Sequence, residues 1–157
     1  MAKPPHRCEA HKVDIKSEEA RLTESLGAWA GASIAGGAAA WAFGKTTGST
    51  AAHAFGRQTL LWGVIDGTIA GVGAIRGRRP RDPGSEIHDA ERLRRILLIN
   101  AAADVAYVAA GVWLMKRPVR EQQRRLTRAD GAAIVIQGGF LLALDTTVAA
   151  RLRQATS

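Results

Sequence analysis

The sequence contains little cysteine and few aromatic residues, and each shortage excludes a class of function. Cys8 is the only cysteine in the 157 residues, which excludes a fold held together by internal disulfide bonds. Aromatic residues make up 5% of the chain, too few for a surface that stacks the bases of single-stranded nucleic acid. The first 25 residues are polar and have no short apolar core before a small-residue cleavage site, so we expect no secretory signal.

Charged residues, apart from isolated aspartates, are missing from much of the chain. Lys, Arg, His and Glu are absent from four runs of 16 to 20 residues: 26–43, 60–75, 96–115 and 132–150. A helix of about 20 apolar residues crosses a bilayer core. A soluble bundle would carry charged residues along one face of every helix. We therefore predict an all-α fold, a four-transmembrane-helix bundle over residues 17–157, preceded by a polar N-terminal tail over residues 1–16.

Two of the four predicted spans are only marginally apolar. On a membrane-insertion scale, Leu, Ile, Phe and Val each favour insertion by about 0.3–0.6 kcal/mol, whereas a central Asp opposes it by about 3 kcal/mol. In run 60–75, the cost of inserting Asp66 therefore about balances the favourable insertion free energy of the Leu, Ile and Val residues. Run 26–43 consists largely of Ala and Gly. We expect both helices to require protein neighbours.

Small residues recur at every fourth position in these two runs. The sets are Gly27, Gly31, Ala35 and Gly63, Gly67, Gly71. Residues four apart lie on one face of a helix, and small side chains there let two helix backbones approach closely in a membrane. We predict that the second set is a helix-packing face.

Polar residues lie in or beside the last three runs. They are Gln58, Asp66, Asn100, Asp104, Tyr107, Gln137 and Asp145. Ionisable residues in a span usually face the protein interior, so we predict an intramembrane polar cluster. No Lys, Arg or His lies within the runs, so we expect protonated carboxyl groups bonded to Asn100, Gln137 or one another. His53 and Arg57 are alternative partners if the second helix begins near Ala51.

The spacing of two Gln–Asp pairs suggests an internal repeat. Gln58 precedes Asp66 by eight residues, and Gln137 precedes Asp145 by the same number. Eight residues are a little over two helical turns, so each pair shares a side of its helix. This favours two repeated helical hairpins.

The polar cluster has two interpretations. In the first, its residues hold helices together through hydrogen bonds of roughly 0.6–2 kcal/mol each, which gives a structural or regulatory bundle. In the second, they form the path of a small proton- or cation-coupled transporter, oligomeric in the membrane. We favour the first and keep the second as the alternative. A membrane enzyme ranks third, because the spans contain no nucleophile–base pair and no catalytic residues are predicted.

Two motifs that resemble ligand sites are rejected. The residues GKTT, which begin at Gly44, resemble a phosphate-binding loop, but the position of that pattern's first glycine is occupied by Ala39. His6, Cys8 and His11 have the chemistry of metal ligands but lack a fourth ligand at a clear spacing. We expect no metal and no cofactor.

Basic residues predict the orientation. Lys and Arg number 22 and the net charge is +8. With the N-terminus inside, 14 basic residues lie in inner segments and 8 in outer ones, so the positive-inside rule favours cytoplasmic termini. Trp41, Trp62 and Trp113 would then lie toward the outer interface. We expect the Arg-rich loops to contact anionic lipid headgroups in preference to nucleic acid.

Three segments together resemble a known family. The stretches RQTLLWGVIDG, INAAADVAYVAAG and IQGGFLLALD resemble small uncharacterised bacterial four-helix integral membrane proteins, common in actinobacteria. The resemblance covers about residues 55–150. It implies a multi-pass protein of the bacterial cytoplasmic membrane with no assigned activity, and its signature positions would be the seven polar residues above together with Trp62.

Overall fold

The described part of the protein consists of four long helices. The computed structural model describes residues 15–78 and 86–156. The helices are α1 (Ile15–Thr47), α2 (Thr50–Gly77), α3 (Glu86–Lys116) and α4 (Glu121–Thr156). No strand occurs in these two ranges. The predicted all-α fold with four helices is confirmed.

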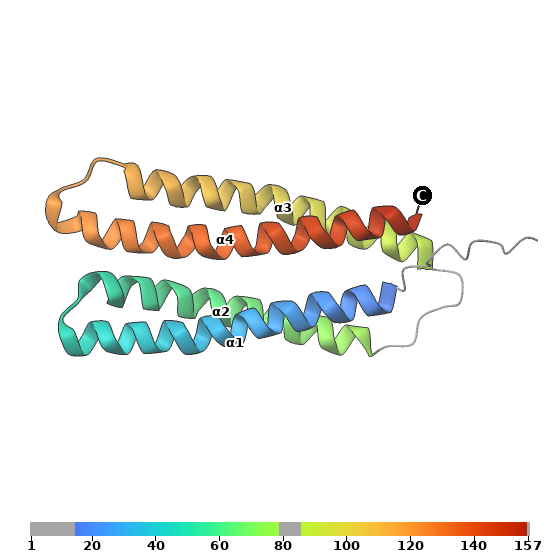
Figure 1. The fold of residues 1–157 in the computed structure, drawn as a ribbon, viewed down its shortest axis with the longest axis horizontal. Coiled ribbons are helices and arrows are strands. Elements are labelled where there is room, and N and C mark those ends of the chain that lie inside the picture. The colour runs from blue at the N-terminus through green and yellow to red at the C-terminus, as the bar shows by residue number, and fades with distance from the viewer. Residues whose placement is uncertain (1–14, 79–85, 157) are drawn as a thin grey trace, which may run out of the picture.

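The helices form two antiparallel hairpins that lie side by side (Figure 1). α1 turns into α2 through Gly48, whose positive φ of 72° is a conformation that glycine adopts without steric cost. The first residues of α1 and α3 and the last residues of α2 and α4 lie together at one end, called here the terminal end. The α1–α2 and α3–α4 connections lie at the opposite end, the loop end.

The first hairpin packs through small residues spaced seven apart. They are Ala30, Gly37 and Gly44 on α1, and Gly56, Gly63 and Ala70 on α2, all buried. A Cβ atom on Gly37 would lie 2.5 Å from the backbone nitrogen of Leu60, so no larger residue fits without a shift. This close backbone approach suits a pair of helices that have few large apolar side chains to interlock.

The packing face differs from the predicted one. A Cβ atom on Gly63 would lie 2.8 Å from the nitrogen of Ile34, but on Gly67 it would make an ordinary 3.6 Å contact with Ala30 Cβ. At Gly71 it would meet nothing within 4 Å. The four-residue row therefore lies in the contact at Gly63, reaches its edge at Gly67 and has left it at Gly71. A step of four residues rotates the position by about 40° around the helix and a step of seven by only about 20°, so the seven-residue row stays in the contact.

The second hairpin follows the same rule and places two acids inside. The buried seven-residue rows are Ala90, Leu97, Asp104, Gly111 on α3 and Gly131, Gly138, Asp145, Leu152 on α4. Near the loop end a Cβ atom on Gly131 would lie 2.6 Å from the carbonyl oxygen of Gly111. Asp104 and Asp145 face the interior because they occupy positions in these rows.

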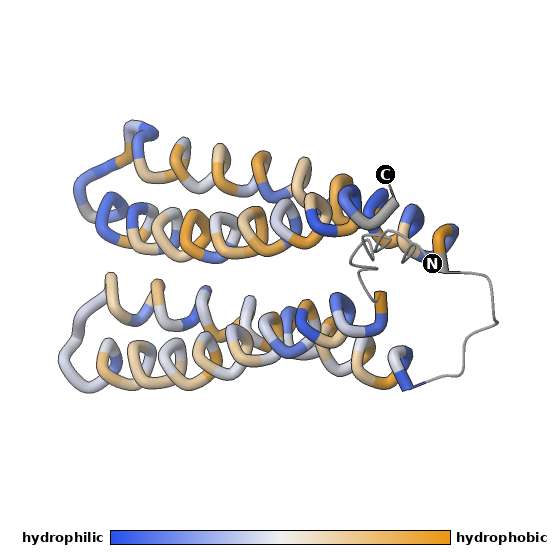
Figure 2. Tube along the Cα trace, turned by 45° about the vertical axis from the view of Figure 1, so that its right-hand side comes forward, coloured by the Kyte–Doolittle hydropathy of each residue, from blue (hydrophilic) through white to orange (hydrophobic). Residues whose placement is uncertain are grey.

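Three of the four helices could cross a membrane by length and composition. These segments are Thr50–Gly77, Ile87–Lys116 and Gln123–Gln154. The predicted span in α1 does not qualify among the described residues, because its many Ala and Gly residues contribute little apolar surface. Figure 2 shows hydrophilic residues at the α3–α4 connection and toward the terminal end, with paler and apolar stretches between them.

Candidate functional site

A cavity of about 470 Å³ lies among the four helices. Its polar and aromatic lining residues are Trp62, Asp66, Asn100, Asp104, Tyr107 and Asp145. Five of them belong to the predicted polar cluster, and the structure brings these five together from α2, α3 and α4. We call this space the acidic cavity.

The cavity exists because α2 and α3 stay apart. Among the described residues, no Cα atom of α2 lies within 8 Å of one in α3, although both helices pack closely against other helices. The aromatic rings of Trp62 and Tyr107 bridge the two helices with centroids 5.3 Å apart and planes at 83°. This edge-to-face pair lines the cavity on the loop-end side of the carboxyl groups, because Trp62 precedes Asp66 in α2 and Tyr107 follows Asp104 in α3.

The three carboxyl groups are almost fully buried. The exposed fractions of Asp66, Asp104 and Asp145 are 1%, 5% and 7%. The side chain of Asn100 hydrogen-bonds Asp145, and Asp104 interacts electrostatically with both other acids. Within the described part of the chain, one buried oxygen of Asp66 and one of Asp104, both Oδ2, have no hydrogen-bond partner. The expected hydrogen bonding of the acids is thus present at Asp145 and incomplete at the other two.

Gln137 lies in a different contact from the acids. It is 1% exposed, and its Oε1 accepts a hydrogen bond of 2.6 Å from Trp29 Nε1. Its Nε2 donates to Ser33 Oγ over 3.0 Å. Trp29 also stacks on Phe140, with centroids 4.1 Å apart and planes at 8°. Gln137 therefore joins α4 to α1. The sequence had suggested instead that its amide bonds the acids.

Gln58 and the two basic residues near it also lie away from the acids. Gln58 is half-buried and does not line the acidic cavity. α2 begins at Thr50, as the alternative pairing required, but His53 accepts a 2.8 Å hydrogen bond from Trp41. Arg57 forms a 3.7 Å ion pair with Asp130. The two Gln residues of the suggested repeat thus occupy different surroundings, whereas the two Asp residues share the cavity.

A family model described as a family of unknown function, DUF6992, matches residues 25–146. The chain belongs to this family. Neither a curated protein nor a solved structure matches the chain. The matched range of this DUF6992 protein includes all three carboxyl groups of the acidic cavity. The predicted resemblance to a family without an assigned activity is confirmed, and the bacterial origin stays a prediction.

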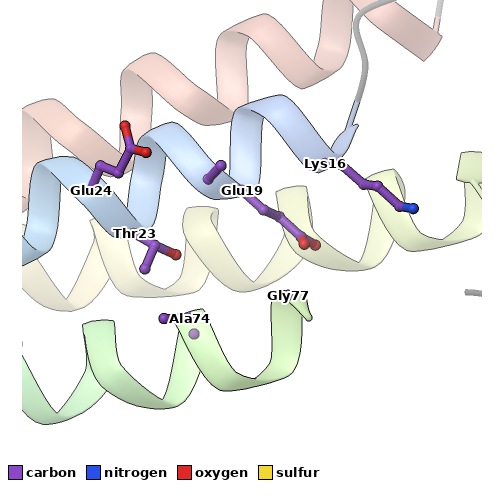
Figure 3. Close-up of a pocket in the computed structure, with 8 residues that line it drawn as sticks. Lys16, Glu19, Thr23, Glu24, Ala74 and Gly77 are labelled. Atoms are coloured by element: carbon purple, nitrogen blue, oxygen red, sulfur yellow. The ribbon is translucent and has the colours of Figure 1, made fainter. Parts of the chain in front are cut away.

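A groove at the terminal end of this DUF6992 protein leads toward the acidic cavity. Figure 3 shows Lys16, Glu19 and Thr23 of α1 beside Ala74 and Gly77 of α2, around a space of about 230 Å³. A larger adjoining space of about 610 Å³ is lined by further charged residues, Arg76, Asp89 and Arg92. It shares Leu22, Leu93 and Ile96 with the acidic cavity. We call the two spaces together the terminal groove.

The described residues contain no group of three or more His, Cys, Asp or Glu side chains that could hold a metal ion. The three carboxyl groups of the acidic cavity therefore do not converge on one point as the ligands of a metal ion do. His6, Cys8 and His11 lie outside the described residues.

Trp62 lines the acidic cavity, but residue types alone did not predict it as part of the polar cluster. It was assigned to a membrane interface, although the resemblance included it among the signature positions. Trp62 precedes Asp66 by four residues, a spacing that places both on one helix face. That spacing is the signal that points to a shared site.

Proposed function

We propose that this chain is an integral membrane protein of the bacterial cytoplasmic membrane, in which all four helices span the bilayer and both termini are cytoplasmic. α1 supports this because its backbone packs against the apolar helix α2 at Gly37, Gly44 and their partners. A helix with little apolar surface is stable in a bilayer when a neighbour covers it. The even number of spans agrees with both ends of the described chain lying at the terminal end (Figure 1).

We further propose that the acidic cavity binds a cation or a proton, as part of a small transporter. The observation that carries this proposal is the pair of buried, unpartnered oxygens, Asp66 Oδ2 and Asp104 Oδ2, lining a cavity within the bundle. Burial of a carboxyl group without a partner is costly, so such groups in a membrane span commonly mark an ion or proton pathway. In a cluster with a purely structural role, we would expect both of these oxygens to accept or donate a hydrogen bond.

The terminal groove supports a route to the acids from the cytoplasmic side. Its charged residues are compatible with water, and its inner wall is formed by Leu22, Leu93 and Ile96, which also line the acidic cavity. On the other side of the carboxyl groups, the Trp62–Tyr107 pair narrows the space between α2 and α3. A binding site open toward one side at a time is what a carrier requires.

A structural role is the second candidate, and a separate observation favours it. Gln137, with both ends of its amide bonded to Trp29 and Ser33, behaves as the interhelical contact that the first interpretation expected. This contact lies outside the acidic cavity, so it is compatible with transport. We also propose that the basic residues near the helix ends contact anionic lipid headgroups. Part of the stretch RGRRPR lies outside the described residues.

The transport proposal is tested with purified full-length protein in liposomes that contain a pH-sensitive dye. A potassium gradient with valinomycin imposes a negative interior potential, and acidification of the interior is recorded with and without external Na⁺. We expect the parent protein to acidify the interior faster than protein-free liposomes. Asp66→Asn should reduce this rate about tenfold or more, because an amide keeps the size of the side chain but cannot titrate.

Asp130→Asn is the matched control, because Asp130 is an acid of α4 outside the acidic cavity. It should transport at the parent rate. Equal rates in the parent and in Asp66→Asn, or a parent rate no faster than that of empty liposomes, would refute proton-coupled transport and favour the structural role.

A further inference from the structure

We propose that the acidic cavity binds an organic ammonium cation that carries its charge on an apolar body. The inference rests on the proposed function, because it names the class of cation that the same cavity takes. It is carried by three properties of the site: its size, its unpaired carboxyl oxygens and its aromatic wall.

The size of the acidic cavity does not match a bare inorganic ion. Its volume is about 470 Å³, whereas one water molecule occupies about 30 Å³ in the liquid. A metal cation is held tightly by several oxygens converging on one point. The described residues contain no such group of ligating side chains. A ligand of several carbon atoms fits this space better than an ion does.

The unpaired carboxyl oxygens require a positively charged group. Asp66 and Asp104 are 1% and 5% exposed, and Oδ2 of each lacks a partner among the described residues. A cationic nitrogen placed between them compensates their burial, and any N–H it carries donates a charge-assisted hydrogen bond. An uncharged ligand would leave the acids uncompensated, and an anion would be repelled.

The aromatic pair provides the second half of the site. Trp62 precedes Asp66 by four residues and Tyr107 follows Asp104 by three, so both rings lie about one helical turn from the carboxyl groups. A cation within about 6 Å of a ring face is attracted by it. The aliphatic walls formed by Ile65, Ile69 and Leu141 can cover an apolar body. The cavity therefore recognises charge and apolar surface in one ligand.

The test uses isothermal titration calorimetry with full-length protein in detergent and benzyltrimethylammonium chloride as the probe. Titration into protein-free micelles is subtracted. The matched uncharged probe is neopentylbenzene, in which carbon replaces the nitrogen, and NaCl serves as the inorganic cation. We expect saturable binding of benzyltrimethylammonium and no saturable binding of neopentylbenzene or Na⁺ at the same concentrations.

Four variants locate the binding. Asp66→Asn should raise the dissociation constant of the probe about tenfold or more, and Trp62→Leu should raise it about fivefold. Asp130→Asn and Trp113→Leu are the controls, because neither residue lines the acidic cavity, and both should bind as the parent does. Gel filtration of each variant confirms that it is folded.

The outcomes separate this inference from the transport proposal. Absence of probe binding, or equal binding by the parent and Asp66→Asn, overturns the organic-cation inference. If proton flux in liposomes is then still lost in Asp66→Asn, the transport proposal stands with a proton as its cargo. If the parent protein shows neither probe binding nor proton flux, both proposals are overturned.

Discussion

At the scale of single residues, the bundle contains two kinds of buried polar side chain. Gln137 is fully engaged, because its amide accepts from Trp29 and donates to Ser33. Asp66 is equally buried, but its Oδ2 has no partner in the described part of the chain. A satisfied buried amide stabilises the contact between its helices, whereas an unsatisfied carboxyl opposes folding. The first property suits a structural contact and the second suits a binding site.

This difference predicts opposite stabilities for two leucine variants. Asp66→Leu should leave the free energy of unfolding unchanged or raise it by up to about 2 kcal/mol, because it removes a buried uncompensated carboxyl. Gln137→Leu should lower it by about 1–3 kcal/mol, because Trp29 Nε1 and Ser33 Oγ lose their partner. Thermal unfolding in detergent measures both. A loss in Asp66→Leu as large as in Gln137→Leu would mean that Asp66 has a stabilising partner.

At the scale of helices, the seven-residue rows explain both the close packing and the position of the acids. In the first hairpin the rows hold Ala and Gly, and the backbones of α1 and α2 come together. In the second hairpin the same spacing includes Asp104 and Asp145, which therefore face inward. The hairpins meet mainly through α4, so α2 and α3 leave room for the acidic cavity between them.

A pair of glycine variants on α2 tests the seven-residue packing. Gly63→Val should destabilise the protein by about 1–3 kcal/mol, because its Cβ atom would lie 2.8 Å from the backbone nitrogen of Ile34. Gly71→Val should change stability by less than about 0.5 kcal/mol, because nothing lies within 4 Å of a Cβ atom there. The measurement is the midpoint of thermal unfolding in detergent. Equal losses at both positions would favour the four-residue face instead.

At the scale of the whole molecule, long helices and charged ends fit a protein held across a bilayer. The helices have 33, 28, 31 and 36 residues, more than the roughly 20 that a bilayer core requires. Their ends therefore extend beyond the apolar region, where ion pairs such as Glu18–Arg151 and Arg57–Asp130 join elements of the two hairpins. The exposed apolar residues of α2 and α3 outside the acidic cavity, among them Ile75 and Ile99, then face lipid.

Cysteine labelling tests the four-span topology. In a Cys8→Ser background, Thr47→Cys at the loop end should react with a membrane-impermeant maleimide in intact cells. Gln154→Cys at the terminal end should react only after the membrane is opened, because the positive-inside rule places that end in the cytoplasm. Three spans, α2 to α4, separate these two positions, so protection of both in intact cells would contradict that number of spans. Labelling of both Thr47→Cys and the parent chain's own Cys8 in intact cells would contradict a span in α1. Labelling of Gln154→Cys but not of Thr47→Cys in intact cells would indicate the opposite orientation.

The sequence by itself was sufficient to predict the four helices, because the absence of charge over 16 to 20 residues is a local property. Of the four spans that it predicted, three qualify as candidates by length and composition. It also grouped five polar residues that line the acidic cavity: Asp66, Asn100, Asp104, Tyr107 and Asp145. The three carboxyl groups are buried, since a carboxyl group in an apolar run has few other places to go, whereas Asn100 and Tyr107 are exposed. The sequence predicted a span in α1 from the absence of charge, whereas α1 does not qualify as a candidate span because of its Ala and Gly content.

Only the tertiary structure decided which of these residues meet. Gln137 and Asp145 lie on the same helix eight residues apart, yet one contacts α1 and the other lines the acidic cavity. The rotation of a helix against its neighbours sets such partners, and that rotation depends on which small residues allow two backbones to approach. The separation of α2 from α3, which creates the cavity and lets Trp62 reach Tyr107, likewise follows from how two hairpins dock, because no local pattern encodes the distance between helices that do not touch.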